Sequence, residues 1–245
     1  FVTIPAIETG ASPSASGAEL TVAAYNLRMG YGIDGRFDPA GVAEQIRRSG
    51  AQVVLLSEVD RGWLLNGGQD ELAILARMLG MRAVFGPAAD PVWGDAILTS
   101  LPMSDTASMK YPMFDALTGA GITAATVDWH GTGVRVLATH LQPDGNETNA
   151  TERASEVFAK ALRAGDAPTI GGGDLNTTPG SGAWDALLSS GAQDALSGIR
   201  PALTSPADAP AEQIDHLLVS GLAVVRAEVI DSTLSDHLMI VTTLR

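Results

Sequence analysis

The sequence predicts a mixed α/β sandwich, and its composition and the order of its elements are the reasons. Apolar residues make up 45% of the 245 residues and charged residues 18%, which allows a large buried core and argues against wholesale disorder. Strand-like and helix-like segments alternate along the chain, and hairpin-like pairs of strands fill the gaps. This order favours a mixed sandwich over a purely parallel, doubly wound sheet.

The first half of the chain divides into strands and helices with recognisable ends. The helix predicted over 38–50 has Asp38 as a candidate N-cap, Pro39 in its first turn and Gly50 as its stop. The other elements predicted here are a strand over 19–27, a buried strand over 51–59, a helix over 69–80, and strands over 81–87 and 93–100.

The second half is richer in strands. A hairpin is predicted around Gly131-Thr132-Gly133. The elements predicted around and after it are strands over 121–131 and 133–142, a helix over 149–165, a strand over 167–174, a helix over 180–191, and strands over 211–220, 222–230 and 237–244. The small, polar residues 8–19 resemble a linker. We therefore assign residues 1–19 to a linker or N-terminal extension and residues 20–245 to one domain.

Charge and cysteine content narrow the function classes. The formal net charge of -13 argues against sequence-independent binding of nucleic acid, because such binding requires basic residues that neutralise phosphates. It does not exclude a phosphoester substrate, because a bound divalent cation supplies positive charge locally. The sequence contains no cysteine, so disulfides and thiolate metal sites are excluded.

Polar residues end several of the predicted strands. They are Asn26, Glu58, His140, Asp174, Asn176 and Asp215, with Asp236 and His237 just before the last strand. Burying an unpaired carboxylate costs several kcal/mol (of order ~5). So many polar strand ends are best explained if they converge on one site in a cleft.

These side chains suit metal-assisted phosphoester chemistry. Carboxylates such as Glu58 and Asp236, with the amide oxygen of Asn26, are the hard ligands that Mg²⁺ or Mn²⁺ prefers. A His–Asp pair can take a proton from water, and asparagine amides can donate hydrogen bonds to the transition state. Each residue can also have a purely structural role, such as an exposed strand end, a helix cap or a turn.

The motifs that carry these residues occur in the order found in a known superfamily. Asn26, SEVD with Glu58, ATHLQ with His140, GGDLN, IDHLLVS and SDHLMIV resemble the endonuclease/exonuclease/phosphatase superfamily over residues 20–245. That fold is shared by DNase I-like nucleases, neutral sphingomyelinases and inositol polyphosphate phosphatases. The resemblance implies a four-layer α/β sandwich of two mixed β-sheets flanked by helices. It also implies Mg²⁺-assisted, in-line attack of water on a phosphoester.

The resemblance assigns a role to each motif residue. Glu58 would be the main metal ligand, with Asn26 and Asp236 close to the metal. His237 would be the general base, oriented by Asp215.

The remaining motif residues would handle the nucleophile and the phosphate. Asp174 would orient or activate the nucleophile, Asn176 would bind the scissile phosphate, and His140 would contact the phosphate or act as general acid. Two positions depart from the family pattern. Arg28 replaces a second polar residue and would instead meet phosphate, and Asp95 replaces an asparagine. Asp95 would orient His140, add a metal contact or alter substrate preference.

A narrower resemblance concerns YNLRMGYGIDGRFD, the segment from SEVD to residue 81, and GDAILTSLPM. These are similar to bacterial relatives of the luminal C-terminal domain of GPI-anchor lipid-remodelling proteins. The similarity implies a membrane-tethered, extracytoplasmic domain acting on a lipid or glycolipid phosphodiester. We expect a monomeric phosphodiesterase whose substrate is a lipid-linked or small phosphodiester. The alternatives are a metal-dependent endo- or exonuclease, and a catalytically inactive binding module of a membrane protein.

Overall fold

The computed structural model describes residues 1–10, 17–114, 119–144 and 149–245, and it has two sheets of seven strands each. The first sheet contains, in spatial order, β1 (Val2–Thr3), β7 (Met103–Lys110), β8 (Gly121–Trp129), β9 (Thr132–Thr139), β10 (Thr169–Asp174), β12 (Asp215–Ser220) and β11 (Gln193–Asp194). The second contains β13 (Val224–Ile230), β14 (Met239–Leu244), β3 (Leu20–Asn26), β4 (Val53–Asp60), β6 (Trp93–Thr99), β5 (Arg82–Pro87) and β2 (Ala6–Ile7).

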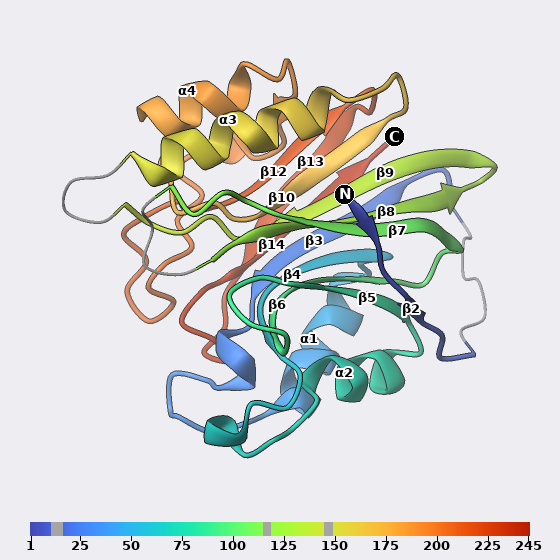
Figure 1. Ribbon diagram of the computed structural model, residues 1–245, viewed down its shortest axis with the longest axis vertical. Coiled ribbons are helices and arrows are strands. Elements are labelled where there is room, and N and C mark those ends of the chain that lie inside the picture. Colours follow the sequence, from blue (N-terminus) through green and yellow to red (C-terminus); the bar gives the residue numbers. More distant parts are fainter. Residues whose placement is uncertain (11–16, 115–118, 145–148) are drawn as a thin grey trace.

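Helices cover both outer faces of the stacked sheets. Figure 1 shows α3 (Ala150–Arg163) and α4 (Gly182–Leu188) over the first sheet, and α1 (Pro39–Ser49) and α2 (Glu71–Leu79) on the opposite side, under the second. Short 3-10 turns, η1 (Arg28–Gly30), η2 (Leu64–Asn66) and η3 (Ser197–Ile199), lie in the connections. The four-layer α/β sandwich expected from the sequence is therefore confirmed.

Each sheet contains one parallel pair of neighbouring strands among antiparallel ones. β3 runs parallel to β4, and β9 runs parallel to β10. The β8–β9 hairpin turns at His130 and Gly131, whose φ angles of 53° and 82° suit a tight two-residue turn. Both sheets are mixed, as the element order predicted.

Three apolar layers hold the sandwich together. The layer between the sheets includes Leu55 and Val136, one from each sheet. A second layer packs Ile46 of α1 against the second sheet, and a third packs Phe158 of α3 against the first. The 3.6-residue apolar period of the helices and the largely apolar strands are thus both explained by burial.

Local signals set the helix ends as predicted. Asp38 Oδ1 accepts a hydrogen bond from the Gly41 amide at 2.8 Å, which caps α1. Gly50 ends that helix with a left-handed φ of 71°. Within the described chain, none of the helices has the length and apolar content that crossing a bilayer requires.

The structure differs from the sequence prediction at several strands. β7 was not predicted, because its segment mixes exposed and half-buried residues without a clear alternation. β1 and β2 lie in the segment assigned to a linker or extension, and each adds an edge strand to one sheet. Residues 11–16 of the predicted linker lie outside the described residues. β12 begins at Asp215 and β14 at Met239, later than the predicted starts at 211 and 237.

The glycines of β10 permit close approach of the neighbouring strands. A Cβ at Gly172 would lie 2.0 Å from the main-chain oxygen of His216 on β12. We expect Gly172→Ala to lower the free energy of unfolding by about 1–3 kcal/mol or more, because backbone cannot move aside cheaply. Urea unfolding measures this loss. Gly198→Ala, where an added Cβ meets nothing within 4 Å, is the control, and equal stability of the two variants would contradict the explanation.

Candidate active site

The two parallel strand pairs end at the same edge of the sandwich. β3 ends at Asn26 and β10 ends at Asp174, and these strands belong to different sheets. The Asn26 side-chain amide donates hydrogen bonds to Asp174 Oδ2 at 2.9 Å and to Glu58 Oε1 at 3.2 Å. The Asn26 oxygen accepts from the Arg28 amide at 3.0 Å. The convergence inferred from polar strand ends is therefore present, and Asn26 is one of the links between the sheets.

Glu58 has an unusual backbone conformation. The β4–β6 register shifts between Leu56 and Val59, which is a β-bulge. Glu58 lies within it at a φ of 55°, a left-handed value that is uncommon for a residue with a side chain. Bulges redirect side chains near functional sites. Here the bulge turns the Glu58 carboxylate toward Asn26.

Asp174 lies at the centre of the cluster. It is buried, and its Oδ1 accepts a hydrogen bond from the Asn176 amide at 3.1 Å. Its Oδ2 lies 3.4 Å from His140 Nε2 and 3.7 Å from His237 Nε2. Burial raises the pKa of Asp174, and although the two histidines lower it, the net direction is upward.

Asp215 holds His237 beside Asp174. Asp215 stands directly opposite Asp174 in the β10–β12 register, so two carboxylates face each other across neighbouring strands. His237 Nδ1 donates to Asp215 Oδ2 at 2.8 Å, which leaves Nε2 facing Asp174. The carboxylates of Asp174 and Asp215 repel each other, and His237, when protonated, offsets part of this repulsion.

Surrounding charge makes His237 strongly basic. Burial lowers the pKa of His237, but the carboxylates of Asp215, Asp174 and Asp236 raise it to about 10. His237 is therefore a cation at neutral pH unless another positive charge offsets these carboxylates.

His140 Nε2 lies near both the Asn176 side-chain amide and the Asp174 carboxylate. Asn176 Nδ2 donates to the Leu141 carbonyl at 2.7 Å and also faces His140 Nε2 at 3.1 Å. Burial lowers the pKa of His140, but Asp174, Glu58 and Asp95 raise it, and the net direction is upward. His140 Nε2 accepts from Asn176 when it carries no proton and can donate toward Asp174 when it carries one, so the tautomer and the protonation state together select its partner.

Asp95 lies beneath His140 on β6. It is buried, and its Oδ2 has no hydrogen-bond partner among the described residues. The main-chain amide of His140 hydrogen-bonds to the Asp95 carboxylate. Burial raises the pKa of Asp95 to about 7, even though His140 lowers it. Asp95 thus contacts the main chain of His140, and the three roles considered for it stay predictions.

Arg28 and Asp236 form the exposed rim of the site. Arg28 Nε lies 3.6 Å from Asp236 Oδ2, and their side chains are 41% and 45% exposed. Asp236 was predicted to lie near the metal, but the compact groups of potential ligands consist of other residues. The first group consists of Glu58, His140 and Asp174. The second consists of Asp174, Asp215 and His237. Within each group the ligand atoms lie within 4.8 Å of one another. The predicted roles of the site residues stay predictions.

The donor set fits a hard divalent cation. Glu58 and Asp174 offer carboxylate oxygens. Asp174 is buried beside the Asp215 carboxylate, and the positive charge of His140 and His237 offsets this negative charge only in part. The Asn26 nitrogen, not its oxygen, faces these carboxylates, so Asn26 orients the ligands in this arrangement.

Hydroxyl residues that the sequence did not single out hold the cluster in place. Ser57 Oγ accepts from the Asp174 amide at 3.3 Å, and Thr204 Oγ1 accepts from the Asp215 amide at 3.4 Å. Ser235 Oγ donates to the Asn26 carbonyl at 2.7 Å and fixes the turn before His237. Ser57 and Ser235 directly precede the candidate site residues Glu58 and Asp236, so their place in the sequence could have indicated a role near the site. Thr204 is not adjacent to any candidate site residue, so the sequence could not have indicated it.

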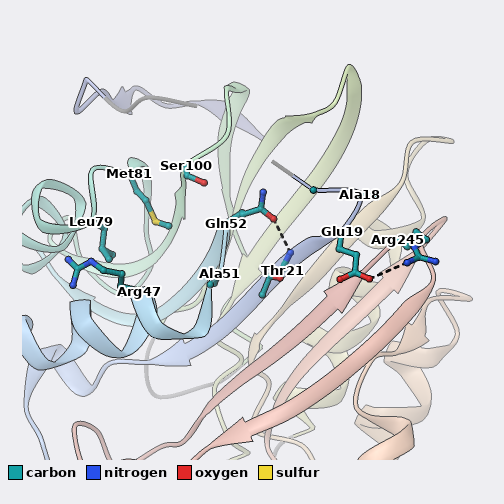
Figure 2. Close-up of a pocket in the computed structure, with 12 residues that line it drawn as sticks. Ala18, Glu19, Thr21, Arg47, Ala51, Gln52, Leu79, Met81, Ser100 and Arg245 are labelled. Carbon is teal, nitrogen blue, oxygen red and sulfur yellow. Dashed lines mark hydrogen bonds and ion pairs between the residues drawn. The ribbon is translucent and has the colours of Figure 1, made fainter. Parts of the chain in front are cut away.

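A separate cavity of about 540 Å³ lies at the other end of β3 and β4. Figure 2 shows its lining, in which the Thr21 amide donates to Gln52 and Arg245 pairs with Glu19. Thr21 and Asn26 lie near opposite ends of β3. None of the predicted site residues lines this cavity, so it is distinct from the cluster.

Comparisons with known proteins agree with this fold. The Endonuclease/Exonuclease/phosphatase family profile matches residues 23–237. An endonuclease/exonuclease/phosphatase structure from Bacteroides vulgatus has a TM-score of 0.79 and 17% identity, covering 94% of this chain and 99% of that one. A homologous structure from Beutenbergia cavernae has a TM-score of 0.72 and 22% identity, covering 93% and 71%. A Bacteroides thetaiotaomicron mannosyl-6-phosphatase has a TM-score of 0.75 and 18% identity, covering 92% and 99%. A search of curated proteins finds no match.

The Asp215–His237 contact makes a spectroscopic prediction. In Asp215→Asn, the pKa of His237 should fall from about 10 by more than roughly one unit, because the removed carboxylate is a main cause of the elevation. NMR titration of the imidazole nitrogens measures it. His216 is an internal control, because burial lowers its pKa to about 4 and it donates instead to the Thr177 carbonyl. An unchanged His237 pKa would contradict the assignment.

Proposed function

Because the chain belongs to the endonuclease/exonuclease/phosphatase family, we propose that it is a divalent-cation-dependent phosphodiesterase acting on a lipid-linked or small phosphodiester. The observation that carries this proposal is the meeting of Glu58, Asp174, His140 and the Asp215–His237 pair at one edge of the sandwich. Such a set provides cation ligands, a proton acceptor and phosphate-binding groups within one site.

His237 and Asp174 are suited to activate water. The 3.7 Å between His237 Nε2 and Asp174 Oδ2 exceeds a direct hydrogen bond, and a water molecule lying beside the two atoms can bond to both. Asp215 fixes Nδ1 and so directs Nε2 toward that water. His237 acts as a base only where the carboxylate charge around it is offset, because it is otherwise protonated at neutral pH.

Mg²⁺ or Mn²⁺ held by Glu58 and Asp174 would supply that positive charge and polarise a phosphoryl oxygen. His140, when protonated, can bind a phosphoryl oxygen or give its proton to the leaving oxygen. Asn176 lies beside it and can donate to the phosphate once its amide turns from His140. Arg28 at the rim is available to a further phosphate oxygen.

The adjoining groove favours a small or lipid-linked diester over nucleic acid. A groove of about 430 Å³ leads away from Asn176, and the charged residues that line it are Asp144, Glu152 and Glu212. These carboxylates would repel a polynucleotide backbone, whose binding depends on neutralisation of successive phosphates. The overall charge of -13 acts in the same direction. We include membrane tethering on the extracytoplasmic side in this proposal, since it fits a lipid-linked substrate.

Hydrolysis of bis-p-nitrophenyl phosphate tests the proposed function. We expect activity with Mg²⁺ or Mn²⁺, loss with EDTA, and a loss of about 10²-fold or more in Glu58→Ala, since the cation would lose a carboxylate ligand. His237→Ala should lose about 10²–10⁴-fold in kcat. Glu44→Ala, on the outer helix α1, is the matched carboxylate control.

Two outcomes would contradict the proposal. Wild type and Glu58→Ala could be equally inert with every metal, or activity could be indifferent to EDTA. A panel of plasmid DNA, RNA, p-nitrophenyl phosphate, sphingomyelin and glycolipid diesters identifies the substrate class. Preferred cleavage of DNA or RNA would favour the nuclease alternative.

A further inference from the structure

The loop that follows the metal-site strand exposes an apolar tip. We define the tip as Trp63, Leu64 and Leu65, which are 39%, 88% and 85% exposed. The two leucines belong to η2 and contribute no buried surface to the core of the described chain. Adjacent, almost fully exposed leucines are unusual on a soluble domain unless the surface meets another apolar phase.

The tip is held rigidly. Asp60 Oδ1 accepts from the Gly62 and Trp63 amides at 2.9 and 2.7 Å, and Asp60 Oδ2 accepts from Asn66 Nδ2 at 3.0 Å. Tyr31 Oη donates to the Asn66 carbonyl at 2.9 Å. The exposure of the leucines is thus a fixed feature of the fold, because hydrogen bonds clamp both sides of the turn.

The tip stands on the same side of the molecule as the candidate active site. Asp60, which clamps it, is two residues beyond Glu58 on β4. The Tyr31–Asn66 bond joins the tip to the segment that follows Asn26 and Arg28. Figure 1 shows η1 in blue and η2 in teal close together at the lower left, beyond the ends of β3 and β4. A surface seated on the tip would therefore lie next to the site.

Area and charge distinguish the possible occupants. Three residues fall far short of the roughly 800 Å² that each partner contributes to a stable protein complex, which argues against a second copy or a protein partner. Arg61 pairs with Asp70 at 2.8 Å beside the tip, so this region offers little unbalanced charge. With a net charge of -13, the protein gains nothing from an anionic surface.

We propose that the Trp63–Leu65 tip inserts into the interface of a zwitterionic lipid layer and so brings the active site to diesters in that layer. The inference rests on the proposed phosphodiesterase function, which it extends to substrate presentation. Two leucines and one tryptophan give shallow, reversible contact, with the apolar side chains below the headgroups and the clamp residues above them.

Flotation with phosphatidylcholine vesicles tests the inference. The wild-type chain should float with the vesicles, and the double variant Leu64→Ser, Leu65→Ser should show a partition coefficient lower by about tenfold or more, because its insertable apolar area is largely gone. The double variant Met78→Ser, Val225→Ser removes two exposed apolar side chains on α2 and β13 and should float as wild type does. Added phosphatidylserine should not strengthen binding.

Turnover of soluble bis-p-nitrophenyl phosphate separates this inference from the proposed function. All of these variants should retain wild-type turnover and thermal stability, since the substituted side chains are exposed and outside the cluster. Absence of turnover would remove the proposed function, whatever the vesicles show. Absence of wild-type flotation, or equal flotation of the tip variant, would overturn the inference alone. A wild-type dimer that the tip variant converts to monomer would overturn it in favour of self-association.

Discussion

The hydrogen bond from Asn26 to Asp174 is the contact on which the candidate site depends. It joins the end of β3 in one sheet to the end of β10 in the other, at 2.9 Å and in a buried setting. The same amide group also reaches Glu58, so one side chain fixes two carboxylates that come from different strands. The hydrogen bond from the Asp174 amide to Ser57 Oγ, at 3.3 Å, is a second link between the same two sheets, and the two links together fix the distance between the strand ends.

The carboxylates brought together in this way repel one another. Asp174 and Asp215 are directly opposite across neighbouring strands, and Glu58 and Asp174 accept hydrogen bonds from the same Asn26 nitrogen. His237 offsets part of the charge, which is the reason that its pKa is raised. A buried cluster of this kind is stable only with further positive charge or protonation. Burial is the main cause of the raised Asp174 pKa, and the Asp215 carboxylate adds to it against the lowering effect of the two histidines.

The sequence predicted the residues of the cluster better than their geometry. Polar residues at the ends of apolar strands are visible in a sequence, and the order of the motifs indicated the fold. The left-handed conformation of Glu58 could not be predicted, because it follows from a bulge against β6. Nor could the orientation of the Asn26 amide, which depends on tertiary contacts with Arg28 and Asp174. β7 was missed because its pairing with β8, and not its own apolar pattern, makes it a strand.

The most direct test of the central claim is the position of a bound cation. In crystals soaked with Mn²⁺, the anomalous difference map should show a peak within about 2.2 Å of carboxylate oxygens of both Glu58 and Asp174. The peak should disappear in Glu58→Ala crystals treated identically. A peak confined to the exposed Asp236, or no peak in the cluster at saturating Mn²⁺, would contradict the account.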